Sequence, residues 1–207
     1  MVSSYPVQFD VDYPSGPLNR LTTAFRFLIA IPIVVLLTML SGSAFNNDDH
    51  STQNSLVIGG AAVFVPLVLM LVFRQKYPRW WFDWNLNLLR FSNRVTAYLA
   101  LLDDRYPSTD EEQSVHLDFA YPEARQMNRW LPLVKWLLAI PHYVVLFFLA
   151  IATIFVVIYA WFAILFTGHY PRGAFEFIEG VLRWTNRVSG YAFTLVTDAY
   201  PPFRLAA

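Results

Sequence analysis

Two similar decapeptides carry the side chains best suited to polar chemistry. Residues 89–98 read "LRFSNRVTAY" and residues 182–191 read "LRWTNRVSGY", with six of the ten positions identical. Each contains an Asn-Arg pair, Asn93–Arg94 in the first and Asn186–Arg187 in the second. A guanidinium group is a planar fork of donors that binds phosphate through two hydrogen bonds. A lipid phosphate or another anion held between the two arginines is therefore one hypothesis.

The same arginines also have a structural interpretation, because aspartates recur with them. In the first copy the arginine would pair with Asp10 or Asp104, and in the second with Asp118 or Asp198. Duplication preserves the contacts of a fold as readily as those of a ligand, so we favour structural ion pairs. The full set of candidates for either role is Arg90, Asn93, Arg94, Arg183, Asn186, Arg187, Asp10, Asp104, Asp118 and Asp198.

His142 is a further candidate, because it is an ionisable residue inside an apolar run. Such residues often mark functional sites in membranes. However, the apolar runs contain no Asp, Glu or second His that would complete a proton relay or a bis-histidine haem site. We therefore expect a neutral histidine that is hydrogen-bonded between helices.

Nothing in the sequence predicts catalysis. It contains no serine-histidine-acid grouping, no H-E-x-x-H motif, no phosphate-binding loop and no dinucleotide fingerprint. It has no cysteine, which excludes disulfides, thiolate metal sites and a cysteine nucleophile. We expect a protein that is not an enzyme and has no cofactor.

The composition is shifted toward that of membrane proteins. Of the 207 residues, 56% are hydrophobic and only 14% are charged, whereas a soluble domain has about 25% charged residues. Fifteen basic and fifteen acidic residues cancel, so the net charge does not favour nucleic acid as a partner. The first 14 residues lack the features of a cleavable signal peptide, so we expect the first apolar run to be retained.

Four membrane spans are expected, at about residues 23–40, 56–73, 131–149 and 151–167. The last two come from one apolar run of 37 residues, which as a single helix would extend about 55 Å. That length is too great for one span, so we place a tight turn near residues 149–153. Lys and Arg lie outside the loops between paired spans, which predicts that both termini are cytoplasmic.

The chain reads as a duplication, with a first copy at 1–108 and a second at 109–207. Each copy would contribute a hairpin of two spans, followed by an amphipathic helix at about 78–102 or 172–196. Since each copy crosses the membrane an even number of times, both should insert the same way up, around a pseudo-two-fold axis along the membrane normal. The expected fold is an all-α membrane protein built as a four-helix bundle.

Two features of this plan remain open. The amphipathic helices would lie at the cytoplasmic headgroup level or fold under the bundle as a cap. The segments "VQFDVDYP" and "VHLDFAYP" alternate as half-buried strands do, and would pair with "AYLALLDD" and "AFTLVTD". The segments "AYLALLDD" and "AFTLVTD" could equally form the C-terminal turns of the amphipathic helices.

The segments "YPVQFDVDYP" and "VKWLLAIPHYVVL", the paired "NRV" tripeptides and the closing "DAYPP" resemble a bacterial family of domains of unknown function, numbered 4389. The resemblance covers nearly the whole chain. It implies a small integral membrane protein with one or two membrane hairpins. It implies no activity, cofactor or catalytic residue.

The functional expectation is a non-catalytic protein of the bacterial cytoplasmic (inner) membrane. It would serve as an accessory or scaffold subunit that packs against a larger membrane complex, against lipids, or against both. Its high aromatic content, 17%, suits interfaces and headgroup belts. The alternative is a component of a small-molecule or lipid transporter, which Gly59, Gly60 and the prolines support only slightly.

Overall fold

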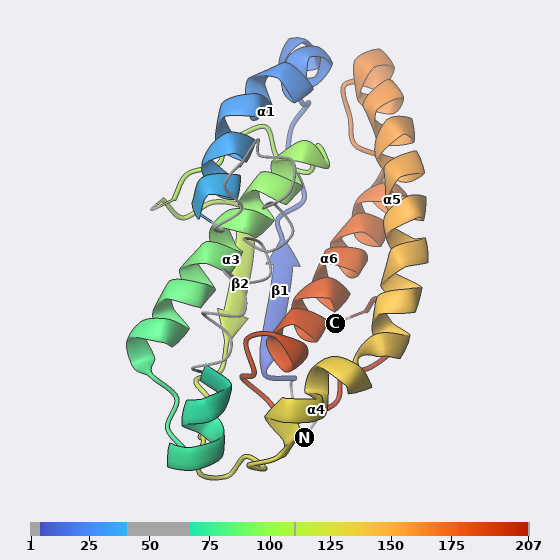
Figure 1. Ribbon diagram of the computed structural model, residues 1–207. Helices are drawn as coiled ribbons and strands as arrows, with labels where there is room; N and C mark the ends of the chain where they lie inside the picture. Colours follow the sequence, from blue (N-terminus) through green and yellow to red (C-terminus); the bar gives the residue numbers. More distant parts are fainter. Residues whose placement is uncertain (1–4, 41–66, 110, 207) are drawn as a thin grey trace, which may run out of the picture.

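A computed structural model describes residues 5–40, 67–109 and 111–206. Its elements are two strands, five α-helices and a π-helical turn (Figure 1). In chain order they are β1 (Val7–Val11), α1 (Arg20–Leu40), η1 (Met70–Arg74), α3 (Arg79–Leu99), β2 (Val115–Phe119), α4 (Leu131–Leu138), α5 (Ile140–Thr167) and α6 (Arg172–Ala192).

The strands form a two-stranded antiparallel sheet, so the expected all-α class is wrong. β1 pairs with β2 in a register that places Phe9 opposite Leu117. Both strands alternate buried and exposed residues, as the sequence pattern predicts. The expected partners are wrong, however, because the strands pair with each other. After α3 and α6 the chain turns instead, with Leu101 and Leu195 in the left-handed conformation at φ 66° and 56°.

Helices α3 and α6 cover the buried face of the sheet, and each packs on the strand of the other copy. β1 packs on α6 and β2 packs on α3. The approach of β1 is close, since a Cβ added to Gly190 would lie 2.5 Å from Cγ2 of Val7. The two copies are thus interlocked rather than side by side.

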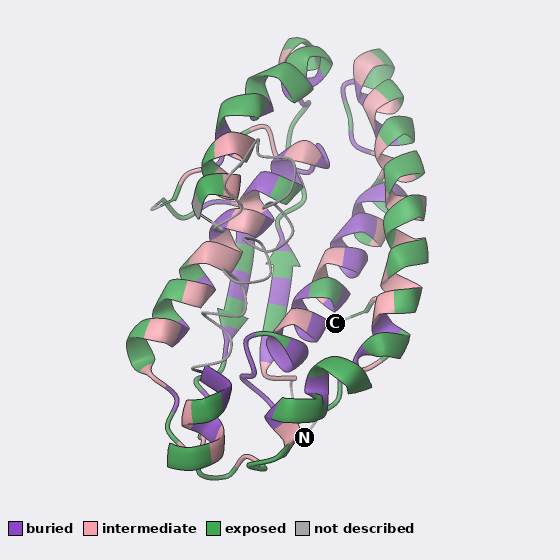
Figure 2. Cartoon of the chain, in the orientation of Figure 1, coloured by how far each residue is buried: buried purple, intermediate pink, exposed green. Residues whose placement is uncertain are grey.

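Helices α1 and α5 form the outer layer. The face of α1 at Thr23, Arg26, Ala30 and Ile33 is buried, at helical spacing, whereas most of its other side chains are not. Of the 28 residues of α5, only His142, Ala160 and Ile164 are buried. Figure 2 shows the contrast between this exposed layer and the buried residues of α6 and the strands.

The structure corrects the prediction of four spans. Helix α5 continues through residues 149–153, where we expected a turn. The helix breaks at Ala139 instead, beside Pro141, which has no N–H to donate to a preceding carbonyl. In the described part of the chain, two helical stretches are long and apolar enough to cross a membrane, Arg20–Met39 and Leu131–Thr167. The expected span at 56–73 lies largely outside the described residues.

The relation between the copies also differs from the expected one. Trp161 of α5 donates to the carbonyl of Thr23 in α1, and the N–H of Leu18 donates to the carbonyl of Gly168. The start of α1 therefore lies at the end of α5, and these equivalent helices run antiparallel, as do β1 and β2 (Figure 1). Two hairpins inserted the same way up would have made the equivalent helices parallel.

Candidate functional site

The two Asn-Arg pairs meet at the crossing of α3 and α6. Asn93 and Asn186 exchange amide hydrogen bonds, of 2.8 Å from Asn93 Nδ2 and 2.7 Å from Asn186 Nδ2. Each Nδ2 also donates to a carbonyl one turn earlier, that of Leu89 or Leu182. Both asparagines are buried. The pair lies on the pseudo-two-fold axis and satisfies its own polar groups.

Arg90 and Arg183 attach each helix to the strand of the other copy. Arg90 Nε donates to the Leu117 carbonyl at 2.8 Å, and its Nη2 lies 2.5 Å from Asp118. Arg183 makes the equivalent contacts with the Phe9 carbonyl, at 2.9 Å, and with Asp10, at 3.3 Å.

Arg183 also pairs with Glu179, one turn earlier on α6. Burial, together with a hydrogen bond to Asp10, raises the pKa of Glu179 to about 7, although Arg183 acts in the opposite direction. Two carboxyl groups and one guanidinium therefore meet where β1 rests on α6.

Asp104 holds α1 and Asp198 holds α4. Asp104 pairs with Arg26 and accepts from the N–H of Asn19, and Asp198 pairs with Lys135 at 2.7 Å and accepts from the N–H of Asn128. Arg26 and Lys135 are 1% and 0% exposed. This pairing was not predicted from the sequence. The recurrence of the two cations in "FRFLIAIP" and "VKWLLAIP" was the available signal.

Arg94 and Arg187 bind different segments of the chain. Arg94 donates to the Ser108 carbonyl at 2.8 Å. Arg187 donates to the carbonyls of Arg204 and Ala206, and burial lowers its pKa, with Arg204 and Arg183 acting in the same direction. Each guanidinium thus supports the last residues of its own copy.

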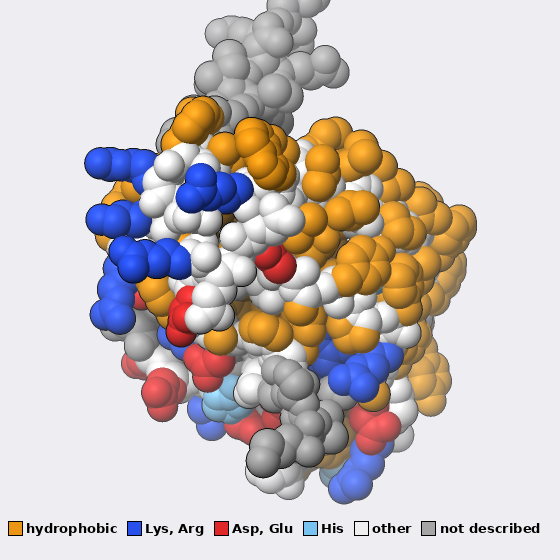
Figure 3. Space-filling model, turned by 90° about the horizontal axis from the view of Figure 1, so that it is seen from below, with side chains coloured by type: hydrophobic (Ala, Val, Ile, Leu, Met, Phe, Trp, Pro, Cys, Tyr) orange, Lys and Arg blue, Asp and Glu red, His pale blue; other side chains and the backbone are white. Residues whose placement is uncertain are grey.

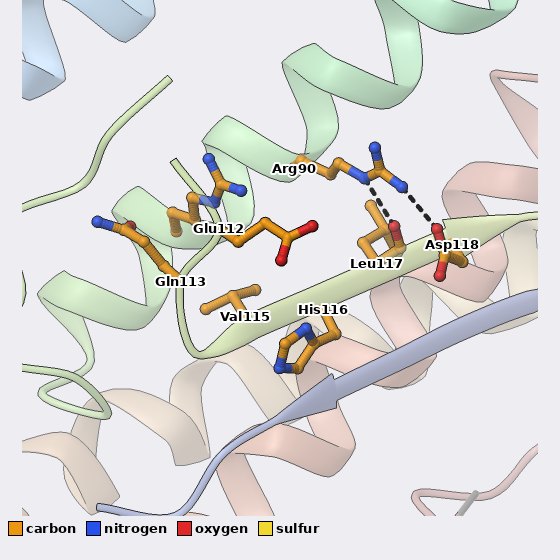
Figure 4. Close-up of a pocket in the computed structure, with 8 residues that line it drawn as sticks. Arg90, Glu112, Gln113, Val115, His116, Leu117 and Asp118 are labelled. Atoms are coloured by element: carbon orange, nitrogen blue, oxygen red, sulfur yellow. Dashed lines mark hydrogen bonds and ion pairs between the residues drawn. The ribbon is translucent and has the colours of Figure 1, made fainter. Parts of the chain in front are cut away.

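One surface pocket brings several of these residues together (Figure 4). It has a volume of about 260 Å³ and lies between α3 and β2. Its lining consists of Arg90, Arg94, Glu112, Gln113, Val115, His116, Leu117 and Asp118. In the view of Figure 4, Arg90 reaches toward the strand at Leu117 and Asp118. With two guanidinium groups and two carboxylates, the lining suits a small polar molecule that carries both signs of charge.

The equivalent place in the second copy is filled by the C-terminal segment. A Cβ added to Gly180 would lie 2.8 Å from Cβ of Leu205, so this segment lies directly on α6. Arg183 donates to the Leu205 carbonyl at 3.2 Å. The duplication is therefore asymmetric here, with a pocket beside α3 and a packed tail beside α6.

His142 lies in an aromatic enclosure at the start of α5. Trp184 Nε1 donates to His142 Nδ1 at 3.1 Å, and the rings of Phe203 and Tyr200 lie 4.0 and 4.8 Å from the imidazole ring, centroid to centroid. Because Nδ1 accepts, the proton of the neutral ring is on Nε2. Among the described residues, Nε2 meets no acceptor.

Comparison with known proteins gives a single result. No curated protein and no solved structure matches the chain. Residues 130–204 match the model of a family described as "Domain of unknown function (DUF4389)". The matched stretch contains α4, α5, α6 and most of the tail that packs on α6. Over residues 130–204, about a third of the chain, the protein is therefore similar to the DUF4389 family.

Proposed function

We propose that this protein is a non-catalytic membrane module whose outer layer, α1 and α5, lies in hydrocarbon while the sheet faces water. In that position it serves as an accessory or scaffold subunit, in contact with lipids and with a larger membrane protein. The observation that carries the proposal is the opposition of an apolar face and a charged face on one small molecule.

The apolar face is large and aromatic. On α5, Phe147, Phe148, Phe155 and Phe166 are 62%, 64%, 67% and 78% exposed. On α1, Phe27 is 61% exposed. Soluble monomers rarely expose contiguous apolar surface on this scale, and such surfaces mark contact with membrane or protein.

The opposite face is polar. The outward side chains of the sheet include Asp10, Asp12, His116 and Asp118, which are between 55% and 77% exposed. Figure 3 shows hydrophobic side chains gathered over one side of the molecule, with charged side chains along its left and lower edges. Charged groups are costly in hydrocarbon, so the α1–α5 face is the one suited to lipid.

The position of the sheet supports one arrangement of the protein in the membrane over another. The strands lie at the height of the lower half of α5, which is its N-terminal half (Figure 1). If α5 stood upright across the bilayer, the charged strands would be inside the hydrocarbon. We propose instead that the α1–α5 face is embedded from the cytoplasmic side of the inner membrane, where an excess of Lys and Arg is tolerated.

Membrane fractionation tests the proposal. The protein, expressed in bacteria, should remain with the membranes after alkaline carbonate washing. The double variant Phe148→Glu/Phe155→Glu should be released or degraded, because it places two carboxylates on the apolar face. The matched control Gln8→Glu/His116→Glu adds two carboxylates to the sheet and should stay bound. Equal release of both variants would contradict the assignment of the two faces.

A photo-crosslinking residue at position 155 tests the accessory role separately. A subunit packed against a larger protein should give a protein adduct of defined mass in native membranes. The same residue at position 8 should not give that adduct. Lipid adducts alone at position 155 would remove the scaffold part of the proposal and leave the membrane part.

A further inference from the structure

A group of five exposed cations lies at the end of the molecule where η1 leads into α3. This basic rim consists of Arg74, Lys76, Arg79, Arg125 and Arg129. It comes from two segments that are joined by hydrogen bonds. Arg129 Nη2 donates to Gln75 Oε1 at 2.9 Å, and Tyr121 donates to the Tyr77 carbonyl at 2.6 Å.

The rim has an excess of positive charge. Within 73–84 and 120–130 the acidic residues are Asp83 and Glu123, against five cations. Figure 3 looks at this end of the molecule and shows Lys and Arg side chains along its left edge, beside the hydrophobic surface. Positive charge and apolar surface are therefore both present at this end of the molecule.

Exposed aromatic residues adjoin the cations in sequence. Phe73 precedes Arg74, Trp80 follows Arg79 and Trp130 follows Arg129, and these rings are 76%, 70% and 69% exposed. Tryptophan is favoured at the headgroup level, where its ring contacts both apolar and polar layers. Alternating cations and aromatic rings suit the boundary between acyl chains and headgroups.

The duplication separates the cations that serve the fold from those that do not. Arg79 lies over the ring of Tyr121 and its equivalent Arg172 lies over Tyr13, each at 5.3 Å. By contrast, Arg74 and Lys76 correspond to Thr167 and His169 in the second copy.

Arg125, like Arg74 and Lys76, has no cationic counterpart in the other copy. The equivalent loop of the first copy, "SGP" after "DYP", contains no cation. Within the part of the chain that the structure describes, the side chains of Arg74, Lys76 and Arg125 make no hydrogen bond or ion pair. These three cations therefore have no cationic counterpart in the other copy, and their side chains make none of the described polar contacts that hold the fold together.

We propose that the basic rim binds the headgroups of anionic phospholipids and gives the protein a preference for them over zwitterionic lipids. This inference rests on the proposed membrane function and specifies its lipid. The phosphates would be bound by Arg74, Lys76 and Arg125, with Trp80 and Trp130 at the level of the glycerol backbone. An anionic surface attracts each nearby Lys or Arg, and salt weakens the attraction.

Quenching of tryptophan fluorescence in reconstituted vesicles tests the preference. Wild-type protein is placed in phosphatidylcholine vesicles that contain brominated phosphatidylglycerol or brominated phosphatidylcholine, and the ratio of the two association constants is obtained. We expect a ratio above about five, because one cation near an anionic surface contributes roughly that factor and the rim would bring three. The ratio should approach one in 0.5 M salt.

Two triple variants remove the same charge from different places. Arg74→Gln/Lys76→Gln/Arg125→Gln should bring the ratio to about one. Arg20→Gln/Arg105→Gln/Arg204→Gln, which removes exposed cations elsewhere, should leave it unchanged. Equal loss in both variants, or a wild-type ratio of one, overturns the inference.

Two further arms separate the possible causes of failure. Carbonate resistance is measured on the same vesicles: an embedded protein with a ratio of one loses the lipid inference alone, whereas a protein that washes off loses the proposed function as well. Millimolar inorganic phosphate is compared with chloride at equal ionic strength. If phosphate abolishes the preference, the rim binds soluble phosphate and the lipid assignment is wrong.

Discussion

Asn93 and Asn186 form a reciprocal amide pair where α3 crosses α6, 93 positions apart in the chain. The same residue of each copy meets its own equivalent, so the pair marks the pseudo-two-fold axis of the molecule. Arg90 and Arg183 then lie on either side of it, each bound to the strand of the other copy. The polar residues repeated in the decapeptides therefore join the two copies.

The two asparagines of the pair should be coupled in stability, so that the losses from the two single replacements add up to more than the loss from replacing both. Asn93→Leu leaves Oδ1 of Asn186 buried without its donor, which we expect to lower the free energy of unfolding by about 1–3 kcal/mol. Asn93→Leu/Asn186→Leu should cost less than the sum of the two single variants. Denaturation in a mild detergent measures the four corners of this cycle, and strict additivity would show that the two amides do not interact.

The ion pair of Lys135 with Asp198 should respond differently to the loss of each partner. Lys135 is 0% exposed and Asp198 is 28% exposed. Asp198→Asn leaves a buried cation without its counter-charge and should cost about 3 kcal/mol or more. Lys135→Met should cost less, because the remaining carboxylate reaches water. Thermal unfolding of both variants measures the two losses of stability. A larger loss in Lys135→Met than in Asp198→Asn would contradict the assigned burial of Lys135.

Glu179 predicts a pH dependence of stability. Burial and the hydrogen bond to Asp10 raise its pKa from 4.5 to about 7. The native state therefore holds a proton that the unfolded chain has lost between these values. Its contribution to stability is complete below pH 4.5 and declines as the pH rises to about 7. In Glu179→Gln this decline should vanish from denaturation curves recorded between pH 4.5 and 8, and an unchanged decline would assign it to other groups.

Gly190 should tolerate no larger residue while Val7 lies against it. In Gly190→Ala the new Cβ would lie 2.5 Å from Cγ2 of Val7, so β1 must shift. We expect a loss of about 1–3 kcal/mol from overpacking. The same substitution made in a Val7→Ala background should cost clearly less. The equivalent residue of the first copy is already Ala97, which is 0% exposed, so Ala97→Gly should itself destabilise the protein, through the loss of a buried methyl group and of helix propensity.

Several local features could be predicted from the sequence, because they depend on neighbouring residues. The alternation in "VQFDVDYP" and "VHLDFAYP" predicts strands, and β1 and β2 lie there. The apolar stripes predict amphipathic helices, and α3 and α6 lie there. Pro141 predicts the helix break before α5, because the missing N–H is a local property of that residue. The length of the apolar run led us instead to expect a turn near residues 149–153.

The partners of these elements could not be predicted in the same way. The four aspartates recur at equivalent positions, yet Asp10 and Asp118 pair with arginines of the other copy, and Asp104 and Asp198 with cations of α1 and α4. Sequence spacing does not distinguish a contact within a copy from an equivalent contact between copies. Either kind of contact would pair the same types of charged group.

The sequence by itself determined a repeated, apolar, cysteine-free chain with strands, amphipathic stripes and paired polar residues, because composition and periodicity act over a few residues. Only the tertiary structure decided that the strands pair with each other, that equivalent helices run antiparallel, and that α5 is one continuous helix. These outcomes depend on which apolar faces can be buried together. Those faces belong to segments that lie more than 100 residues apart in the chain. The sequence pattern does not specify which of these distant segments pack together or in which orientation.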